Sequence, residues 1–199
     1  MARPREFDYD QTMATAISVF NRLGYHAVTT DDLRLAMGIG RQSFYSTFGG
    51  KRQLFLAVLQ RYTDESVSKK IARLQSHHSA IAAFEALLST VAEETEEVRL
   101  QGCLGINTRC VFTPQDSEVE AILRSAGTRL HTVITLRLQQ AIAEGELSPI
   151  EDISSAATFI QNTLVGITIA AKTGIAPEAL RNMASFAIGG LRHQPRVLP

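Results

Sequence analysis

Apolar side chains recur at helical spacing in the N-terminal quarter of the chain, and they predict three short helices. Met13, Ala16 and Phe20 share one stripe of the first helix. This helix is expected to stop near Gly24, because glycine readily takes the left-handed conformation that ends helices. A third helix is predicted over Arg41–Phe48, directly after a glycine-rich turn. The arrangement is typical of a helix-turn-helix.

A capping signal marks the start of the second helix. Thr29 is followed three residues later by Asp32, which resembles a capping box with Asp in place of the usual Glu or Gln. Val28 and Leu33 occupy the apolar positions that flank such a cap. The signal predicts a helix that begins just after Thr29 and turns Leu33 inward.

The third predicted helix has two chemically different sides. A helical wheel places Phe44 and Phe48 on one side and Gln42, Tyr45 and Ser46 on the other. The aromatic side is expected to anchor the helix in a core. The polar side is therefore left free to contact a partner.

The remainder of the chain also predicts helices and no strands, so the fold class is all-α. Asp116 or Ser117, and later Asp152, stand where they can cap long helices. We expect a small domain over residues 1–52 and a larger helical domain over residues 53–199. The predicted later helices cover residues 54–74, 80–98, 117–144 and 152–173, with a last helix from Pro177 to Gly189-Gly190.

Charge is distributed unevenly although the formal net charge is zero. Residues 1–62 hold eight Lys and Arg against five Asp and Glu, a net charge of +3, and residues 63–199 carry the opposite −3. The basic half is the one with the helix-turn-helix pattern. This favours a nucleic acid as its partner, with phosphate contacts doubled if the protein is a dimer.

No stretch of the sequence predicts an address or a membrane span. Charged and polar residues follow Met1 directly, and no uninterrupted apolar run approaches the roughly 20 residues of a membrane helix. The two cysteines form no paired framework, as expected for a reducing compartment. We therefore expect a cytoplasmic protein without a membrane partner.

The segments FNRLGY, TTDDL and MGIGRQSFYSTF, followed by Lys51, resemble the DNA-binding domain of the TetR/AcrR family of bacterial transcriptional regulators. The chain departs from the usual family pattern at Gly40, Thr47 and Gly49-Gly50. The resemblance implies that the third helix enters the major groove of double-stranded operator DNA and that nearby residues contact phosphates. The DNA-binding residues implied are Thr29, Thr30, Arg41, Gln42, Ser43, Tyr45, Ser46, Thr47 and Lys51.

The same resemblance implies a homodimeric regulator, most commonly a repressor, that a small-molecule effector releases from a near-palindromic operator. The long helices near residues 117–144 and 152–173 match the family's dimer interface, and small residues in the second, such as Ala156, Ala157 and Gly166, would allow close approach. An activator stays open, since the sequence does not place the operator relative to a promoter. The larger domain would bind the effector. Candidate lining residues are Phe84, Leu88, Cys103, Ile106, Asn107, Phe112, His131, Thr168 and Lys172.

The stretch QGCLGINTRC resembles a Gly-Cys-Leu motif followed by Asn that occurs in some TetR-like proteins. If a helix begins near Gly102, Cys103 lies in its first turn, where amide groups favour a thiolate. One hypothesis is that Cys103 senses an oxidant or electrophile with help from Lys172. The alternative is that Cys103 is a small buried residue without chemistry.

Catalytic signatures are not found in the sequence. No Ser-His-Asp set, Gly-rich phosphate loop or metal-ligand spacing is present, so we expect no enzymatic activity, no cofactor and no metal. His77-His78 is expected to form a surface turn. A small helical enzyme or thiol-based redox protein without DNA binding is the alternative function.

Overall fold

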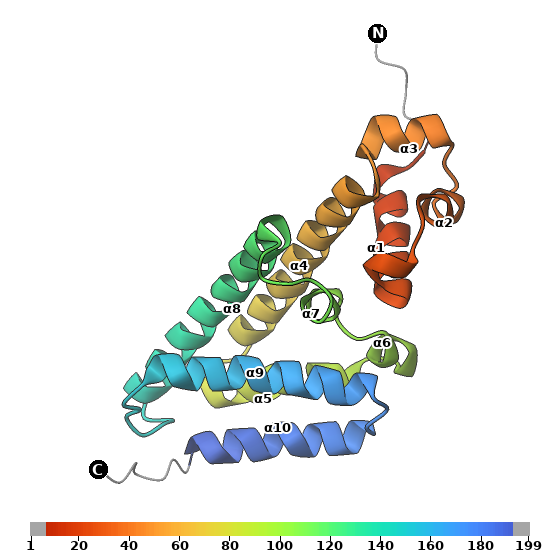
Figure 1. Ribbon diagram of the computed structural model, residues 1–199. Coiled ribbons are helices and arrows are strands. Elements are labelled where there is room, and N and C mark those ends of the chain that lie inside the picture. The colour runs from red at the N-terminus through yellow and green to blue at the C-terminus, as the bar shows by residue number, and fades with distance from the viewer. Residues whose placement is uncertain (1–6, 193–199) are drawn as a thin grey trace. The chain divides into compact units, whose positions relative to one another are not determined.

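The computed structural model describes residues 7–192, and the regular structure in that span is helical throughout (Figure 1). This confirms the predicted all-α fold. The helices are α1 (Tyr9–Ala27), α2 (Thr30–Ala36), α3 (Arg41–Phe48), α4 (Lys51–Gln75), α5 (Ala80–Glu93), α6 (Glu96–Gln101), α7 (Leu104–Arg109), α8 (Ser117–Ala143), α9 (Ile153–Lys172) and α10 (Pro177–Arg192).

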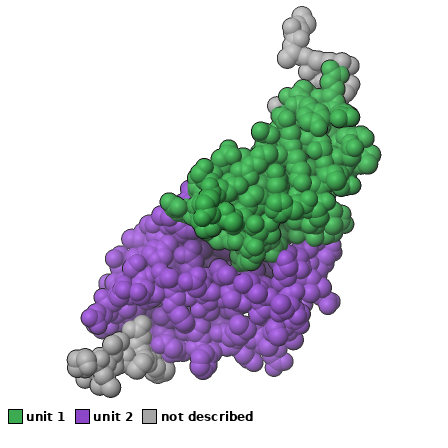
Figure 2. Space-filling model, viewed as in Figure 1, with its two compact units in different colours: residues 1–65, 103–124 green, residues 66–102, 125–199 purple. Residues whose placement is uncertain are grey.

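The described chain forms two compact units, each assembled from segments that are distant in sequence (Figure 2). Unit 1 contains the residues up to 65 together with residues 103–124. Unit 2 contains residues 66–102 together with those from 125 onward. Helices α4 and α8 therefore each contribute to both units. The functional division at residue 52 is a separate prediction, because it concerns roles rather than compactness.

The first helix of unit 1 begins with a side-chain cap and is interrupted at a glycine. Asp8 Oδ1 accepts hydrogen bonds from the backbone amides of Asp10 and Gln11, at 2.9 and 3.1 Å. These bonds satisfy donors that the first turn leaves without helical partners. Near the other end, Gly24 takes a φ of +77°, which interrupts the helical conformation at the predicted position. Phe20, just before it, is fully buried.

The capping box predicted at the second helix is confirmed. Asp32 N donates to Thr29 Oγ1 at 3.1 Å, and Thr29 N donates to Asp32 Oδ2 at 2.9 Å. Gly38 then adopts a φ of +66°, which makes the tight turn into α3 possible. Helix α3 spans Arg41–Phe48, as predicted, and its N-cap Gly40 provides no side-chain hydrogen bond.

Unit 2 has its own core, built mainly where α10 packs against α5 and α9 (Figure 1). Phe84, Leu87 and Leu88 of α5 are fully buried there, as the apolar stripe of that helix predicts. Ile160 of α9 and Leu180 of α10 are likewise excluded from solvent. Helix α6 packs against α9 within the same unit.

A carboxylate ties the segment after α8 to the start of α5. Glu146 Oε2 accepts hydrogen bonds from Ile81 N at 3.0 Å and Ser79 Oγ at 2.8 Å. These bonds stabilise the charged carboxylate and hold the pKa of Glu146 below its ordinary value, with the Ile81 amide the larger cause. Ser79 Oγ also accepts a hydrogen bond from Ala82 N. The first turn of α5 is therefore capped by Ser79, its neighbour in sequence, and by the distant Glu146.

Two helix boundaries predicted from the sequence are wrong. The helix expected over residues 80–98 ends at Glu93, because Glu94 is extended and Thr95 caps a new helix, α6. The last helix does not end at Gly189-Gly190 but continues to Arg192. Neither glycine takes a positive φ, and burial of Leu191 in the core favours continuation of the helix.

Helix α9 is long and apolar enough to pass for a membrane span by length and composition alone, with a mean hydropathy of 1.3 in its best window. Part of this apolar character has a role inside unit 2. Ala157, Ile160, Leu164 and Ile167 lie on one face of α9 and are buried in the core. A core helix of this kind passes the same test, so the feature is weak evidence for a membrane.

Candidate nucleic-acid interface

The structure gives α3 the two faces that the sequence predicts. Phe44 is fully buried, and Phe48 nearly so, in the core of unit 1. Arg41, Gln42 and Ser46 are exposed on the other side. The helix is thus held by its aromatic face, while donors and acceptors that can pair with base edges point to solvent.

Tyr45 is exposed and also contacts the buried face of α3. Its side chain is 44% exposed, and its ring meets the buried ring of Phe44 edge-on at 5.5 Å between centroids. The Arg41 guanidinium lies 6.0 Å from the Tyr45 ring centroid, within the range of a cation–π contact. Ser43 and Thr47 are half-buried at the border between the two faces. The exposed face therefore combines charge, amide and hydroxyl groups on one short helix.

Thr29 already has a structural role at the start of α2. Besides the backbone bonds of the capping box, Thr29 Oγ1 donates to Asp32 Oδ2 at 2.6 Å. The hydroxyl bond is the larger cause, and the amide bond the smaller, of the lowered pKa of Asp32. A phosphate that contacted either donor of Thr29 would have to displace Asp32. Its half-buried neighbour Thr30 lies in the first turn of α2.

Lys51 opens α4 and is half-buried. Its Nζ lies 4.6 Å from the centroid of the Tyr25 ring, which follows the Gly24 interruption of α1. This cation–π contact restrains the ammonium group at the border of the core and leaves its hydrogen-bond donors free to meet an anion.

The residue after Lys51 forms an ion cluster that the sequence analysis missed. Arg52 donates from Nη1 to Asp116 Oδ2 at 2.8 Å and from Nη2 to Asp116 Oδ1 at 2.6 Å. A third bond joins Arg52 Nη2 to Glu118 Oε2 at 3.0 Å. The guanidinium lowers the pKa of Asp116, which also caps α8 by accepting from Val119 N at 3.2 Å. One arginine therefore joins the first turn of α4 to the start of α8.

Phe112, a predicted effector residue, belongs to an aromatic cluster in unit 1. Its ring stacks on Phe55 at 5.3 Å and on His26 at 5.8 Å, and it meets Tyr25 at 5.1 Å. The Arg52 guanidinium lies 5.8 Å from the same ring. These contacts bind the segment after α7 to the core around α1 and α4, and the role of Phe112 in a ligand site stays a prediction.

The other predicted effector residues are divided between the two units. Cys103, Ile106 and Asn107 belong to unit 1, where Asn107 Nδ2 donates to Asn21 Oδ1 at 2.9 Å. The remaining five belong to unit 2, and two of these, Phe84 and Leu88, are core residues of α5. In the same unit, His131 Nε2 lies 3.3 Å from Thr158 Oγ1, and Thr168 Oγ1 donates to the α9 backbone. Their role in a ligand site stays a prediction.

The segment around Cys103 differs from the expected helix start. Helix α7 begins at Leu104, so Cys103 is its half-buried N-cap rather than part of its first turn, and Cys110 is the exposed residue after its end. Gly102 takes a φ of +70° and lies against Lys172, whose Cδ would be only 2.9 Å from an added Cβ. The positive φ favours glycine here, and a larger residue would also have to displace the Lys172 side chain.

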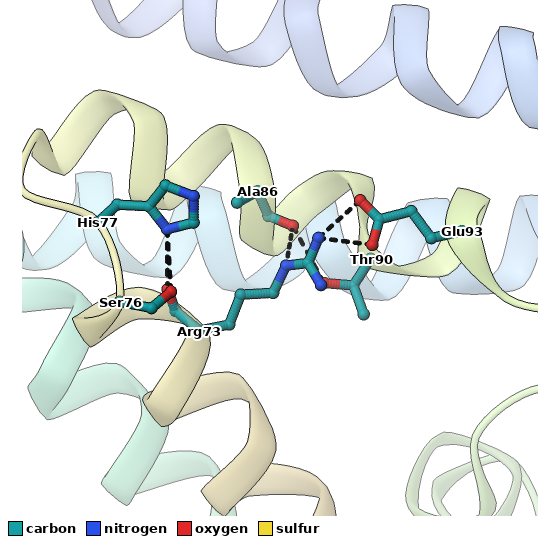
Figure 3. Close-up of polar contacts among 6 residues, drawn as sticks. All are labelled: Arg73, Ser76, His77, Ala86, Thr90 and Glu93. Atoms are coloured by element: carbon teal, nitrogen blue, oxygen red, sulfur yellow. Dashed lines mark hydrogen bonds and ion pairs between the residues drawn. The ribbon is translucent and has the colours of Figure 1, made fainter.

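The far end of α4 is tied to α5 by a second arginine (Figure 3). Arg73 donates from Nε to the backbone oxygen of Ala86 at 2.8 Å and from Nη2 to both carboxylate oxygens of Glu93 at 2.6 Å. Thr90 Oγ1 donates to the same carbonyl at 3.0 Å. Arg73 thus joins the last turns of α4 to α5 within unit 2.

The chain combines a helix-turn-helix, with a buried aromatic side and an exposed polar side, and a helical body with its own core. These are the features of a two-domain DNA-binding regulator. Two family descriptions match the chain. Residues 13–58 match "Bacterial regulatory proteins, tetR family", and residues 80–186 match "Tetracyclin repressor-like, C-terminal domain". The chain belongs to the TetR family and is a transcriptional regulator with a helix-turn-helix DNA-binding domain.

Individual relatives agree with this assignment over nearly the whole chain. It is 31% identical to the HTH-type transcriptional repressor ComR of Escherichia coli over 190 residues, covering 94% of this chain and 90% of ComR. It is 28% identical to the uncharacterised HTH-type regulator YezE of Bacillus subtilis, covering 96% and 100%. A cysteine-substituted variant of the TetR-family regulator CifR, solved with 26-base-pair operator DNA, superposes with a TM-score of 0.83 at 27% identity, covering 96% and 100%.

Proposed function

We propose that the protein is a dimeric transcriptional repressor that binds a near-palindromic operator through α3 and is released by a small molecule. The observation that carries the proposal is the exposed polar face of α3, held in place by buried Phe44 and Phe48. Relatives support it as well, since ComR is named a repressor and CifR was solved on operator DNA. Residues 1–52 would bind DNA, and residues 53–199 would carry the effector and dimer functions.

The side chains of α3 divide into base-reading and phosphate-binding groups. Gln42 is suited to bidentate pairing with adenine, and Arg41 to guanine or a phosphate. Tyr45 offers a phenolic hydroxyl, and Lys51 offers an ammonium group restrained by its aromatic neighbour. The remaining proposed contacts come from hydroxyl groups around α2 and α3. They are Thr29, Thr30, Ser43, Ser46 and Thr47.

A dimer is proposed because one uncharged surface of unit 2 is left exposed. Of the exposed large apolar side chains there, only Leu136 belongs to α8, whereas Phe159 and Ile169 lie on α9 and Met183 and Phe186 on α10. We therefore propose α9 and α10, rather than α8 and α9, as the dimer helices. We call this surface the charge-free face. Its residues are Ser155, Phe159, Asn162, Gly166, Ile169, Ala179, Met183, Phe186 and Gly190.

The small residues expected to allow close approach on α9 have two different roles. Ala156 and Ala157 are buried inside unit 2, so their size serves packing within the chain. Gly166 is exposed on the charge-free face. A two-fold dimer through this face would carry two α3 helices to half-sites about one helical turn, roughly 34–36 Å, apart. An effector that favours a different arrangement of the two copies would release the DNA.

Cys103 is proposed as the effector-responsive residue, with Lys172 assisting. Its half-buried thiol makes no capping hydrogen bond at the start of α7, and Lys172 packs over the preceding residue, Gly102. The thiolate, after its proton has passed to solvent, would add to a carbon of a quinone-like electrophile. A carbon–sulfur bond forms, the carbon–carbon π bond breaks, and its electron pair moves to the carbonyl oxygen, which takes a proton from solvent. Cys103→Ser is expected to abolish operator release by benzoquinone, with Cys110→Ser as the matched control. Unchanged release by Cys103→Ser would contradict this role.

The repressor proposal is tested by a mobility-shift assay with DNA from beside the protein's own gene. Wild-type protein is expected to shift this DNA at low salt, and the Arg41→Ala/Gln42→Ala variant is expected not to. Lys69→Ala is the control, because it removes an exposed positive charge of α4 that lies outside the proposed interface. Transcription in vitro from the adjoining promoter should fall when wild-type protein is added. A folded dimer that fails to shift the DNA, or that raises transcription, would contradict the proposal.

A further inference from the structure

The charge-free face contains an isolated projecting side chain. Phe186 of α10 is 87% exposed, and Met183 and Gly190, one turn to either side of it, are exposed as well. On α9 no charged residue occurs between Ile153 and Ala171. A phenylalanine ring that is almost fully hydrated in the single chain gains most from burial against another apolar surface.

Next to this ring, α10 contains a glycine that packing among residues 7–192 does not explain. A Cβ built on Gly190 meets no atom of these described residues within 4 Å, and the backbone there is not in the positive-φ region that favours glycine. Glycine inside a helix is less stable than alanine. The absence of a side chain at position 190 therefore lowers the stability of the helix, with no compensating contact in the described part of the chain. Close approach by another molecule would compensate.

Gly190 also lines a hollow in the surface of unit 2. The hollow has a volume of about 480 Å³. Its lining is mainly apolar, with Ala156 and Phe159 of α9 and Leu191 of α10, and it also includes the acidic residues Glu151 and Asp152. It is large enough for a phenyl ring, and two of its lining residues, Phe159 and Gly190, belong to the charge-free face that also contains Phe186. A surface that carries both a projecting ring and a hollow can pair with the same surface of a second copy.

We propose that, in the dimer, Phe186 of each copy inserts into the hollow of the other copy, over the partner's Gly190. The proposal rests on the dimer of the proposed function and specifies how its two surfaces fit. Two α10 helices that run antiparallel about a two-fold axis level with Ile188 place position 186 opposite position 190, because each is two residues from the axis. The symmetry makes two identical contacts.

This contact would select a second copy of the same chain over other helical partners. A partner needs both a ring at position 186 and a glycine at position 190 to complete the two contacts. A side chain at position 190 would block the entering ring, and a small residue at position 186 would leave a hollow unfilled. The paired requirement gives a test in which two damaging substitutions compensate each other.

The experiment compares Phe186→Ala and Gly190→Leu, alone and mixed. Each variant alone is expected to weaken the dimer by roughly tenfold or more in sedimentation equilibrium. An equal mixture is expected to form heterodimers preferentially, because one pair keeps its ring over glycine and the other pairs alanine with leucine. Native mass spectrometry of chains with different mass tags measures the heterodimer fraction. Ser185→Leu, an exposed position about 100° around α10 from Phe186, is the control and should dimerise as wild type.

The outcomes separate this inference from the proposal on which it rests. Wild-type protein that stays monomeric at all concentrations would contradict the dimer itself. A wild-type dimer that neither variant weakens would overturn the inference alone. A dimer weakened by Phe186→Ala but not by Gly190→Leu, with a statistical mixture of chains, would also overturn it. That result would indicate that the two Phe186 rings stack on each other.

Discussion

Two exposed surfaces of this chain, the outer face of α3 and the charge-free face of α9 and α10, differ in what they offer to a partner. The α3 face presents the guanidinium of Arg41 and the amide of Gln42 on a helix held by buried aromatic rings. The charge-free face presents Phe186, Met183 and glycine. The first surface suits a polyanion with readable hydrogen-bond groups, and the second suits a protein surface of its own kind.

The exposed groups on the two surfaces also differ in how water affects them. On α3 the exposed groups are polar and are well solvated in the free protein, so they reveal a partner only through their chemistry. On α10 the exposed ring of Phe186 is unfavourable in water, and Gly190 is unfavourable in a helix. The charge-free face is therefore identified by exposed groups that lower the stability of the single chain. The α3 face is identified by polar groups whose chemistry matches that of DNA.

The largest effect should come from removing the support beneath the α3 face. Phe44→Ala is expected to destabilise unit 1 by about 3–5 kcal/mol, because it leaves a cavity at a fully buried position. Chemical denaturation followed by circular dichroism measures the loss, and operator binding should disappear with it. Tyr45→Phe keeps the ring and is the control for stability alone, because it removes a hydroxyl proposed to contact DNA. A stable Phe44→Ala protein with full DNA affinity would break the assignment of a buried and a reading side.

Substitution on the reading side should affect DNA binding without affecting the fold. Arg41→Ala and Gln42→Ala are each expected to cost about 1–3 kcal/mol of operator affinity in fluorescence anisotropy titrations. Unfolding midpoints and dimer affinity should stay at wild-type values, because both side chains are exposed. If either variant weakened the dimer instead, the separation between the two surfaces would fail.

A smaller effect is expected at the start of α2. Thr29→Ala removes the side-chain half of the capping box and should lower stability by about 1 kcal/mol. Thr29→Ser keeps the hydroxyl and should recover most of it. Because Thr29 is also a proposed DNA contact, the operator affinity of Thr29→Ala should fall even under conditions where it is fully folded, and Thr29→Ser should restore it. Wild-type affinity of fully folded Thr29→Ala would contradict that contact and leave Thr29 with its capping role alone.

The smallest effect concerns pH and the Arg52–Asp116 pair. Because Arg52 lowers the pKa of folded Asp116, the pair contributes stability above the unfolded pKa of about 4 and loses it as the pH falls through the lowered folded value. Asp116→Asn can still cap α8 but cannot form the ion pair. Its stability should therefore be lower than wild type near neutral pH, and the difference should shrink in acid. A difference independent of pH would contradict the ionic contribution.

Local sequence signals predicted the local parts of the structure. The Thr29–Asp32 capping box, the turn at Gly38 and the alternation of Phe44 and Phe48 with polar neighbours each act within a few residues. These features position the proposed DNA contacts. They were readable because no distant segment is needed to produce them.

Features that depend on distant segments were missed or misread. Arg52 finds its carboxylate partner 64 residues away, which no helical period indicates. Phe112 was predicted only as a ligand-lining residue, so the packing of its ring on Phe55 and His26 was missed. Gly190 was read as a helix stop, whereas burial of Leu191 keeps the helix intact. In each case, tertiary packing decided the outcome.

The most direct test of the central account changes the spacing of the operator rather than the protein. Once the operator is mapped, about five base pairs, half a helical turn, are inserted between its half-sites, and affinity is measured by anisotropy at fixed salt. The account predicts a large loss of affinity, because a dimer joined through α9 and α10 presents its two α3 helices at one fixed spacing. Insertion of a full turn's length elsewhere in the fragment should have no effect. Equal affinity for the original and the half-turn operators would contradict the account.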